Sequence, residues 1–187
     1  MFPTEKLTAR IDSLFSFSDV RVSRARCVNP RPRYSERKQS IGVHVATSKR
    51  DQAELILAAK RAKRQAYAVY SNFRVGAALL TNSGEIVGGC NVENSSYGLT
   101  ICAERNAVFH AVAKGETGFR SIAIASDDAG FLTPCGACRQ VLAEFSPRME
   151  IILTNAAGHK KITSLDKLFP IPPDLKKLSR RTSKSKK

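Results

Sequence analysis

Three cysteines in two short motifs constrain this chain more than any other feature of its sequence. Cys102 begins the run Cys-Ala-Glu, and Cys135 and Cys138 stand further along in the run Pro-Cys-Gly-Ala-Cys. Three thiolates can bind one zinc ion and leave the fourth tetrahedral position to a water molecule, as catalytic zinc sites do. Any fold of this chain that uses them must bring the two motifs together at one point.

The Cys-x-x-Cys pair alone also occurs in structural zinc sites and in redox-active dithiols. A structural site would need a fourth Cys or His at short spacing, and the remaining cysteines, Cys27 and Cys90, are isolated. A redox pair would leave Cys102 and the glutamate beside it unexplained. We therefore predict a catalytic site with one Zn²⁺ per chain, bound by Cys102, Cys135 and Cys138.

Glu104 lies two positions after the first thiol, and its type and spacing predict proton transfer rather than metal ligation. As a fourth ligand it would close the open position of the site. As a general acid–base it would take a proton from the attacking water and pass it to the substrate, a contribution of ~10²–10⁴ in rate. The pattern matches the signature of zinc deaminases that act on cytosine or adenine. The chain is thus predicted to be a hydrolytic enzyme with Glu104 as its catalytic residue.

Arg105 follows the predicted catalytic residue directly. Zn²⁺ with three thiolates carries a net negative charge, which makes coordinated water less acidic than in a site built from histidines. A neighbouring cation would offset that charge, and Arg105 is a candidate. From the residues alone, a surface position on a helix is an equally good interpretation.

Length and composition suit a single domain in a reducing compartment. The chain has 187 residues, of which 42% are hydrophobic, enough for a packed core. No apolar run approaches the ~18 residues of a membrane span. Charged residues interrupt positions 1–17, so no secretory signal is predicted. The five cysteines lack the spacing of a disulfide framework, and we expect a cytoplasmic protein.

The net charge of +15 belongs to the two ends of the chain. Residues 1–50 and 176–187 each carry +7, whereas residues 51–175 carry +1. We predict a basic, partly disordered extension at 1–47, a catalytic domain at 48–175 and a basic disordered tail at 176–187. Weak, salt-sensitive attraction of the ends to nucleic acid or to anionic membranes is the alternative.

Hydrophobic periodicity predicts an α/β fold in which helices alternate with the strands of one sheet. A first helix should begin at Ser48, capped with Asp51, and continue to about Ser71. The remaining predicted helices are Cys102–Lys114, Cys135–Phe145 and a turn at Leu165–Phe169; the strands are Val75–Thr81, Glu85–Val92, Ser121–Ala125, Glu150–Thr154 and a short Lys161–Thr163. A separate amphipathic pattern joins Leu7, Ile11, Leu14 and Phe15 near the start of the chain.

Several ordered motifs together resemble the cytidine deaminases of nucleoside salvage. They are the run 70–79 (YSNFRVGAAL), the run 89–97 (GCNVENSSY), the run 102–105 (CAER) and the run 134–140 (PCGACRQ). The match covers roughly residues 51–170, and the three-cysteine form resembles the small homotetrameric branch. The resemblance implies a three-layer α/β/α fold with a mixed, roughly five-stranded sheet, and a homotetramer with one Zn²⁺ per chain.

The resemblance also implies roles for individual residues. Phe73 matches the aromatic residue beside the pyrimidine, and Asn91 and Glu93 match the pair that hydrogen-bonds the ribose 3′-hydroxyl. Tyr97 matches a residue that reaches the site of a neighbouring subunit. The backbone around Ala103 should meet the base. Arg105 matches an arginine that hydrogen-bonds the ligand thiolates, which favours that role over a plain surface position.

Two features depart from the family pattern: the C-terminal segment, and the first fifty residues together with the basic tail, which have no counterpart in the compact family pattern. The family often ends in Leu-Leu-Pro-x-x-Phe, whose aromatic ring covers the base of another subunit, and here Pro173 occupies that position. Phe169 or Ile171 is the expected replacement. The three histidines, His44, His110 and His159, match no ligand position and are interpreted as ordinary residues.

The leading hypothesis is zinc-dependent deamination of cytidine and 2′-deoxycytidine to uridine and 2′-deoxyuridine, with release of ammonia. One alternative is a deaminase of another cytosine nucleoside, such as blasticidin S, although Phe73 and the Asn91/Glu93 pair favour plain nucleosides. A second is deamination of polynucleotide cytosine, whose enzymes generally use His where this chain has Cys102. A third is a non-catalytic, zinc-stabilised binding protein, against which the intact Glu104 argues.

Overall fold

The computed structural model describes residues 46–173. The predicted N-terminal amphipathic segment, most of the basic extension and the basic tail lie outside the described residues, so the domain boundaries at 48 and 175 stay predictions. Among the helices of the described part, none combines the length and the apolar character that crossing a bilayer requires.

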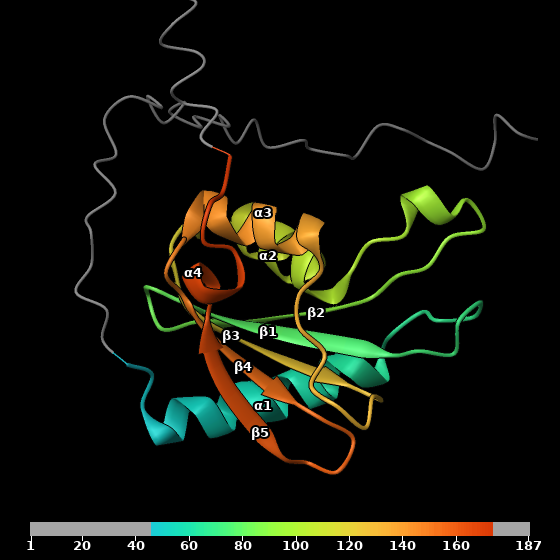
Figure 1. The fold of residues 1–187 in the computed structure, drawn as a ribbon, viewed down its shortest axis with the longest axis horizontal. Helices are drawn as coiled ribbons and strands as arrows, with labels where there is room; N and C mark the ends of the chain where they lie inside the picture. Colours follow the sequence, from blue (N-terminus) through green and yellow to red (C-terminus); the bar gives the residue numbers. More distant parts are fainter. Residues whose placement is uncertain (1–45, 174–187) are drawn as a thin grey trace, which may run out of the picture. The chain divides into compact units, whose positions relative to one another are not determined.

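A mixed five-stranded sheet forms the middle of the described domain (Figure 1). Its strands are β1 (Val75–Thr81), β2 (Ile86–Cys90), β3 (Phe119–Ser126), β4 (Glu150–Thr154) and β5 (Lys160–Ser164). Their order across the sheet is β2-β1-β3-β4-β5. Strands β3 and β4 are parallel, and the other neighbouring pairs are antiparallel. The predicted mixed α/β sheet is confirmed.

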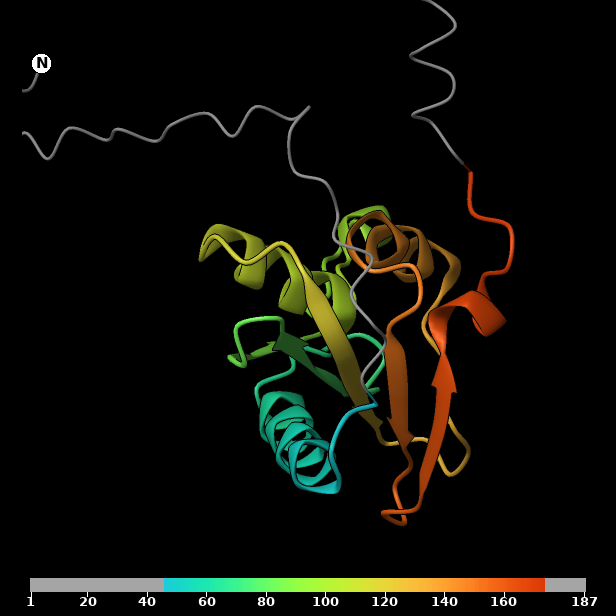
Figure 2. The same ribbon diagram turned by 90° about the vertical axis from the view of Figure 1, so that its left-hand side faces the viewer.

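Helices cover both faces of this sheet and make three layers (Figure 2). Helix α1 (Lys49–Arg64) lies on one face; α2 (Ala103–Ala113) and α3 (Gly136–Phe145) lie on the other, and the short α4 (Leu165–Leu168) follows β5. A single turn of 3₁₀ helix, η3 (Tyr97–Leu99), which the sequence did not predict, precedes α2.

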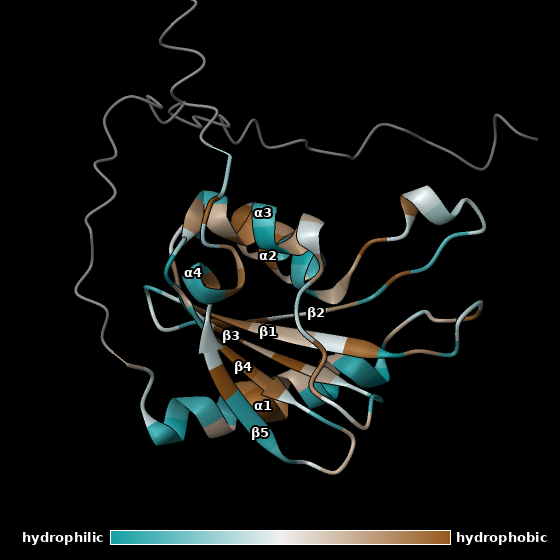
Figure 3. Ribbon diagram, in the orientation of Figure 1, coloured by the Kyte–Doolittle hydropathy of each residue, from teal (hydrophilic) through white to brown (hydrophobic). Residues whose placement is uncertain are grey.

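Alternating side chains of the buried strands supply one hydrophobic core to each face, as a pleated strand must. Ala78 and Leu80 of β1 pack with the α1 side of the sheet, whereas Ala77 and Leu79 face α2 and α3. Strand β1 is buried along its whole length, which explains its uninterrupted apolar sequence. Figure 3 shows hydrophobic, brown stretches on the central strands and hydrophilic, teal stretches along α1.

Helix α1 begins where the sequence predicts but ends earlier. The amide of Asp51 donates to Ser48 Oγ at 3.1 Å, which confirms the predicted cap. The predicted continuation to Ser71 is wrong, since the helix ends at Arg64. Tyr67 instead pairs in parallel with the segment after β2, accepting from the amide of Glu93 at 2.9 Å. This long-range pairing overrides the local apolar periodicity.

The other predicted elements are present with small shifts at their ends. The bounds of β1 and β4 agree with the prediction, and Cys102 and Cys135 are the N-cap residues of α2 and α3 rather than their first helical residues. Strand β2 is shorter than predicted, at Ile86–Cys90.

Gly89 allows α2 to lie directly against β2. A Cβ atom at this position would lie 2.3 Å from the amide nitrogen of Ala107 and 2.7 Å from the carbonyl oxygen of Ala103. Both are backbone atoms of α2, so the helix could not yield by changing a side-chain rotamer. The Asn106 side chain adds a hydrogen bond to the carbonyl oxygen of Cys90 at 2.8 Å. The absence of a side chain at Gly89 therefore sets the height of α2 above the sheet.

We expect Gly89→Ala to lower the free energy of unfolding by about 1–3 kcal/mol, the usual cost of overpacking. Gly88→Ala in the same strand is the matched control, because its Cβ would meet Ala62 Cβ at an ordinary 3.6 Å. Urea denaturation of the zinc-loaded proteins, monitored by circular dichroism, measures both. Equal losses in the two variants would contradict the assigned contact.

Candidate metal and catalytic site

The three predicted zinc ligands meet where α2 and α3 begin. Cys102 and Cys135 are the N-cap residues, both with extended backbone, and Cys138 is buried in the first turn of α3. The Cys102 and Cys135 sulfurs are 3.9 Å apart, the Cys135 and Cys138 sulfurs are 3.5 Å apart, and all three lie within 4.8 Å of one another. Thiolates bound tetrahedrally to one zinc at ~2.3 Å would be separated by about 3.8 Å. The donor set and its spacing thus fit Zn²⁺.

The surroundings favour thiolate character at Cys102. Hydrogen bonding from Cys138 and then from Arg105 lowers the pKa of the Cys102 thiol to about 5. The pKa of Cys138 is raised, because this thiol shares its proton with Cys102 and is desolvated by burial. Both cysteines also stand at helix N-termini, whose dipoles favour negative charge.

Arg105 reaches back from α2 to the first ligand. Its Nη2 atom donates to Cys102 Sγ at 3.4 Å and to the carbonyl oxygen of Thr100 at 3.1 Å. Within residues 46–173, its buried Nε has no hydrogen-bond partner. The guanidinium is therefore anchored by one carbonyl and directed at a sulfur.

Glu104 lies in the first turn of α2 with only 4% of its surface exposed. Burial is the main cause that raises the pKa of its carboxyl group to about 7, and the negative charge on Cys102 adds to the effect. The metal-ligand group found among the described residues contains the three thiols and no carboxylate or imidazole. Glu104 is thus a buried acid beside a potential metal site. His110 and His159 are exposed and outside that group, and His44 lies outside the described residues.

Asn91 and Glu93 hold the loop that carries Phe73. The buried Asn91 side chain accepts from the amide of Val75 at 2.8 Å and donates to the carbonyl oxygen of Phe73 at 2.9 Å. The Glu93 carboxylate accepts from the amides of Tyr70 and Ser71 and from the Ser71 hydroxyl, and the hydroxyl is the main cause that lowers the pKa of Glu93.

These contacts identify a structural task that sequence reasoning missed for both residues. The loop between Tyr70 and Val75 contains Asn72 in the left-handed region, at φ 56°. Backbone in that region is strained for most residues and needs support from its surroundings. Asn91 and Glu93 supply that support whether or not a sugar is bound.

Arg139 ties the second cysteine motif to the end of the domain. It donates to the carbonyl oxygens of Pro134 at 2.7 Å and Leu168 at 3.0 Å, and to Thr133 Oγ1 at 3.3 Å. The sequence motif contains Arg139 but does not indicate this structural role, because its partner Leu168 is distant along the chain.

The residues named as replacements for the aromatic at Pro173 differ in burial. Phe169 is partly buried against the core, whereas Ile171 and Pro173 are exposed. The Phe169 side chain therefore packs against the core of its own chain. Tyr97 is 77% exposed, and its ring makes a T-shaped contact with the Tyr70 ring, at 6.2 Å between centroids.

A family pattern described as the cytidine and deoxycytidylate deaminase zinc-binding region matches residues 49–154. This range includes the three cysteines and Glu104 and spans more than half of the chain. The chain belongs to this deaminase family.

Individual relatives agree with the family assignment. A cytidine deaminase of Sporosarcina psychrophila is 50% identical over 121 residues, which cover 64% of this chain and 89% of the relative. The crystal structure of a cytidine deaminase from Burkholderia pseudomallei matches with a TM-score of 0.63 and 51% identity, over 65% of this chain and 98% of that one. One from Mycobacterium tuberculosis matches with a TM-score of 0.59 and 38% identity, over 67% and 98%. The deaminase fold and its zinc cofactor, predicted from the motifs, are confirmed.

We expect about one zinc per chain in the purified deaminase and a marked loss of zinc in Cys102→Ser and Cys135→Ser. Each substitution removes one of three thiolate donors. Cys90→Ser is the matched control, because the Cys90 sulfur donates to the carbonyl oxygen of Gln65 at 3.4 Å and lies outside the three-cysteine group. Elemental analysis after dialysis against a weak chelator measures all three. Full zinc occupancy in both ligand variants would refute the assigned ligands.

Proposed function

We propose that this deaminase hydrolyses cytidine and 2′-deoxycytidine to uridine and 2′-deoxyuridine, releasing ammonia, as in pyrimidine salvage. The observation that carries the proposal is the buried Glu104 carboxyl beside three thiols at zinc-binding separations. The names of the relatives at 44–50% identity support a cytosine nucleoside as substrate.

Cys102, Cys135 and Cys138 would hold the metal. Zn²⁺ bound there supplies a Lewis acid that lowers the pKa of water and so makes it a nucleophile near neutral pH. Glu104 accepts a proton from this water as its oxygen adds to C4 of the cytosine ring. It would deliver this proton to N3, then take the second proton of the former water from the new C4 hydroxyl group and pass it to the amino group, so that the C4=O bond forms, the C4–N4 bond breaks and ammonia leaves. Desolvation of Glu104 keeps its proton transfers within the site rather than with bulk water.

Arg105 has a positioning role in this proposal. Its bond to Cys102 places positive charge against a ligand set that carries a net negative charge with Zn²⁺. By withdrawing electron density from the Cys102 thiolate, Arg105 would leave a metal bound there a stronger Lewis acid. The Thr100 carbonyl fixes the guanidinium so that this contact does not depend on a mobile side chain.

The substrate contacts follow the family resemblance. We assign Phe73 to the face of the pyrimidine, the backbone around Ala103 to its polar edge, and Asn91 and Glu93 to the ribose 3′-hydroxyl. The hydrogen bonds of Asn91 and Glu93 within the Phe73 loop support a double role. The same side chains would hold the Phe73 ring against the base and hydrogen-bond the ribose.

We also propose that the chain works as a homotetramer in the cytoplasm, where reducing conditions keep the thiols free. Exposed apolar side chains that lie together support self-association, because contiguous apolar patches mark interaction sites. Here Tyr67 pairs with Val92, and the Tyr70 ring lies against Tyr97. Outside the core, Tyr67, Val69, Tyr70, Val92, Tyr97, Leu99 and Phe109 are each between 44% and 77% exposed. Tyr97 is the most exposed of them and is assigned to the site of a neighbouring subunit.

Glu104→Gln should keep zinc and fold but lower the turnover of cytidine by ~10²–10⁴, the usual contribution of a general acid–base. The control is Glu54→Gln, which removes an exposed carboxylate of α1 that, within residues 46–173, pairs with Arg50 alone. The loss of cytosine absorbance measures cytidine, deoxycytidine, blasticidin S and single-stranded DNA in parallel. Near wild-type turnover by Glu104→Gln would mean another base, and faster deamination of DNA than of cytidine would overturn the proposed substrate class.

Subunit mixing tests the shared site. Tyr97→Ala and Glu104→Gln should each be impaired alone, but co-expression should restore part of the activity. Mixed tetramers would contain sites with an intact Glu104 and a neighbour's intact Tyr97. As a control, Glu104→Gln co-expressed with Cys135→Ser should recover nothing if that sulfur serves the same chain's site. No recovery with Tyr97→Ala, or a fully active monomer by light scattering, would contradict the shared site.

A further inference from the structure

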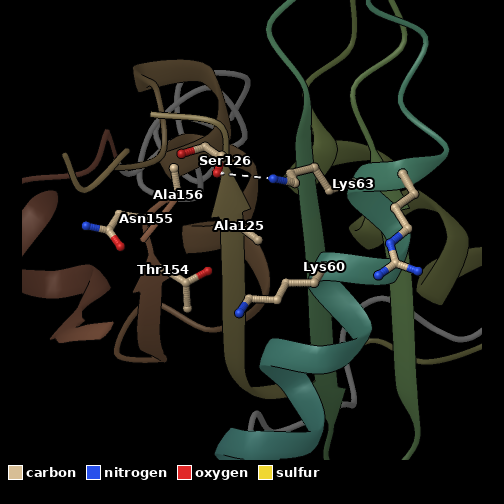
Figure 4. A pocket seen from close by; sticks show the side chains of 8 residues that line it. Lys60, Lys63, Ala125, Ser126, Thr154, Asn155 and Ala156 are labelled. Carbon is tan, nitrogen blue, oxygen red and sulfur yellow. Dashed lines mark hydrogen bonds between the residues drawn. The ribbon is translucent and has the colours of Figure 1, made fainter. Parts of the chain in front are cut away.

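A cavity unrelated to the cysteines opens between α1 and the ends of two strands (Figure 4). Its volume is about 250 Å³. It is lined by Lys60, Lys63 and Arg64 of α1, by Ala125 and Ser126 at the end of β3, and by Thr154, Asn155 and Ala156 at the end of β4. We name this cavity the α1 pocket. No ligand of the proposed metal site and no residue assigned to the nucleoside lines it.

Positive charge dominates the α1 pocket. Lys60, Lys63 and Arg64 are spaced i, i+3 and i+4, so they share one face of the helix. No acidic side chain appears in the pocket lining within residues 46–173, and neither Lys60 nor Arg64 forms an ion pair in that range. Favourable interaction with the helix dipole explains cations in a last turn. It does not explain why these three cations line a cavity, since Arg61 meets the same requirement and lies outside the lining.

The opposite wall is polar and fixed. Thr154 and Asn155 are buried, and their side chains donate to the carbonyl oxygens of Ile124 at 3.2 Å and Ala129 at 2.9 Å. The Ser126 hydroxyl accepts from the amide of Asp128 at 3.3 Å, which leaves its own hydrogen for another acceptor. Figure 4 shows Lys60 and Lys63 directed from α1 towards this wall.

We propose that the α1 pocket binds a phosphate group, either as inorganic phosphate or as the phosphate of a nucleotide. Lysine acts as a point charge for phosphate, and arginine can donate two parallel hydrogen bonds to it. The volume is below the ~300 Å³ at which pockets for drug-sized ligands begin, so the pocket suits a phosphate better than a whole nucleotide. A base and sugar would remain outside.

Lys63 links the pocket to the loop that carries Phe73. Its Nζ lies 2.6 Å from Asp127 Oδ1, and Asp127 Oδ2 lies 3.3 Å from Arg74 Nε, next to Phe73 in the chain. Phosphate in the pocket competes with Asp127 for Lys63. Removing the Asp127 charge should therefore tighten phosphate binding, and losing a pocket cation should weaken it.

The test is isothermal titration of the full-length, zinc-loaded protein with inorganic phosphate at constant ionic strength. We expect Lys60→Ala and Arg64→Ala each to weaken binding about tenfold, the scale of one charge-assisted hydrogen bond. Asp127→Asn should bind more tightly than wild type. Arg61→Ala is the control, because it removes the same charge from the same helix outside the pocket. The basic chain ends are the same in every variant, so any phosphate that they bind contributes equally to each titration.

Titration with adenosine 5′-monophosphate distinguishes a nucleotide phosphate from inorganic phosphate as the ligand of the α1 pocket. Its purine does not fit a site for cytosine, so we expect no binding of this nucleotide at the proposed catalytic site. Tighter binding of the nucleotide than of phosphate would assign the pocket to a nucleotide phosphate, and equal or weaker binding to inorganic phosphate. The proposal is overturned if phosphate binds no better than chloride at matched ionic strength. It is also overturned if Lys60→Ala and Arg64→Ala bind as Arg61→Ala does.

Discussion

The meeting of two helix N-termini is the constraint on which the site depends. Cys102 and Cys135 each occupy an N-cap position, where serine, threonine, asparagine or aspartate would normally accept a hydrogen bond from the helix. Among the described residues, neither thiol makes such a capping bond. Both sulfurs are therefore free to face one another across 3.9 Å. Two helix dipoles favour negative charge at that point, and a zinc ion held there would offset the repulsion among the three thiolates.

Separate contacts fix each helix. Gly89 and the Asn106 side chain hold α2 on β2, while Arg139 binds the residues before Cys135 to the end of α4. The cysteine separation therefore depends on the sheet and on α4, neither of which contains a ligand. Catalytic groups must be held to a fraction of an ångström, and residues without chemical roles provide that precision here.

The sequence predicts the elements of this fold better than it predicts the roles of individual polar residues. Buried strands such as β1 and the spacing of the cysteines are local signals, and both are found in the structure. The end of α1 is not local, because Tyr67 leaves the helical pattern to pair with residues beyond β2. Asn91 and Arg139 likewise act through partners that only the fold brings close. The spacing of residues along the sequence does not predict such long-range contacts.

Charge separates the two faces of the domain and bears on its substrate. On the α2 and α3 face, the proposed zinc with three thiolates has a net negative charge that Arg105 roughly neutralises. The Glu93 carboxylate, with its pKa lowered, adds negative charge beside the Phe73 loop. A neutral nucleoside meets no net charge at such a site, whereas the phosphate of a nucleotide whose ribose bound at Asn91 and Glu93 would face the Glu93 carboxylate. The cations of α1 lie on the opposite face of the sheet, where they cannot shield a phosphate at the cysteines. The arrangement therefore supports the proposal that the substrate is a neutral nucleoside, while the proposed phosphate site lies elsewhere on the same domain.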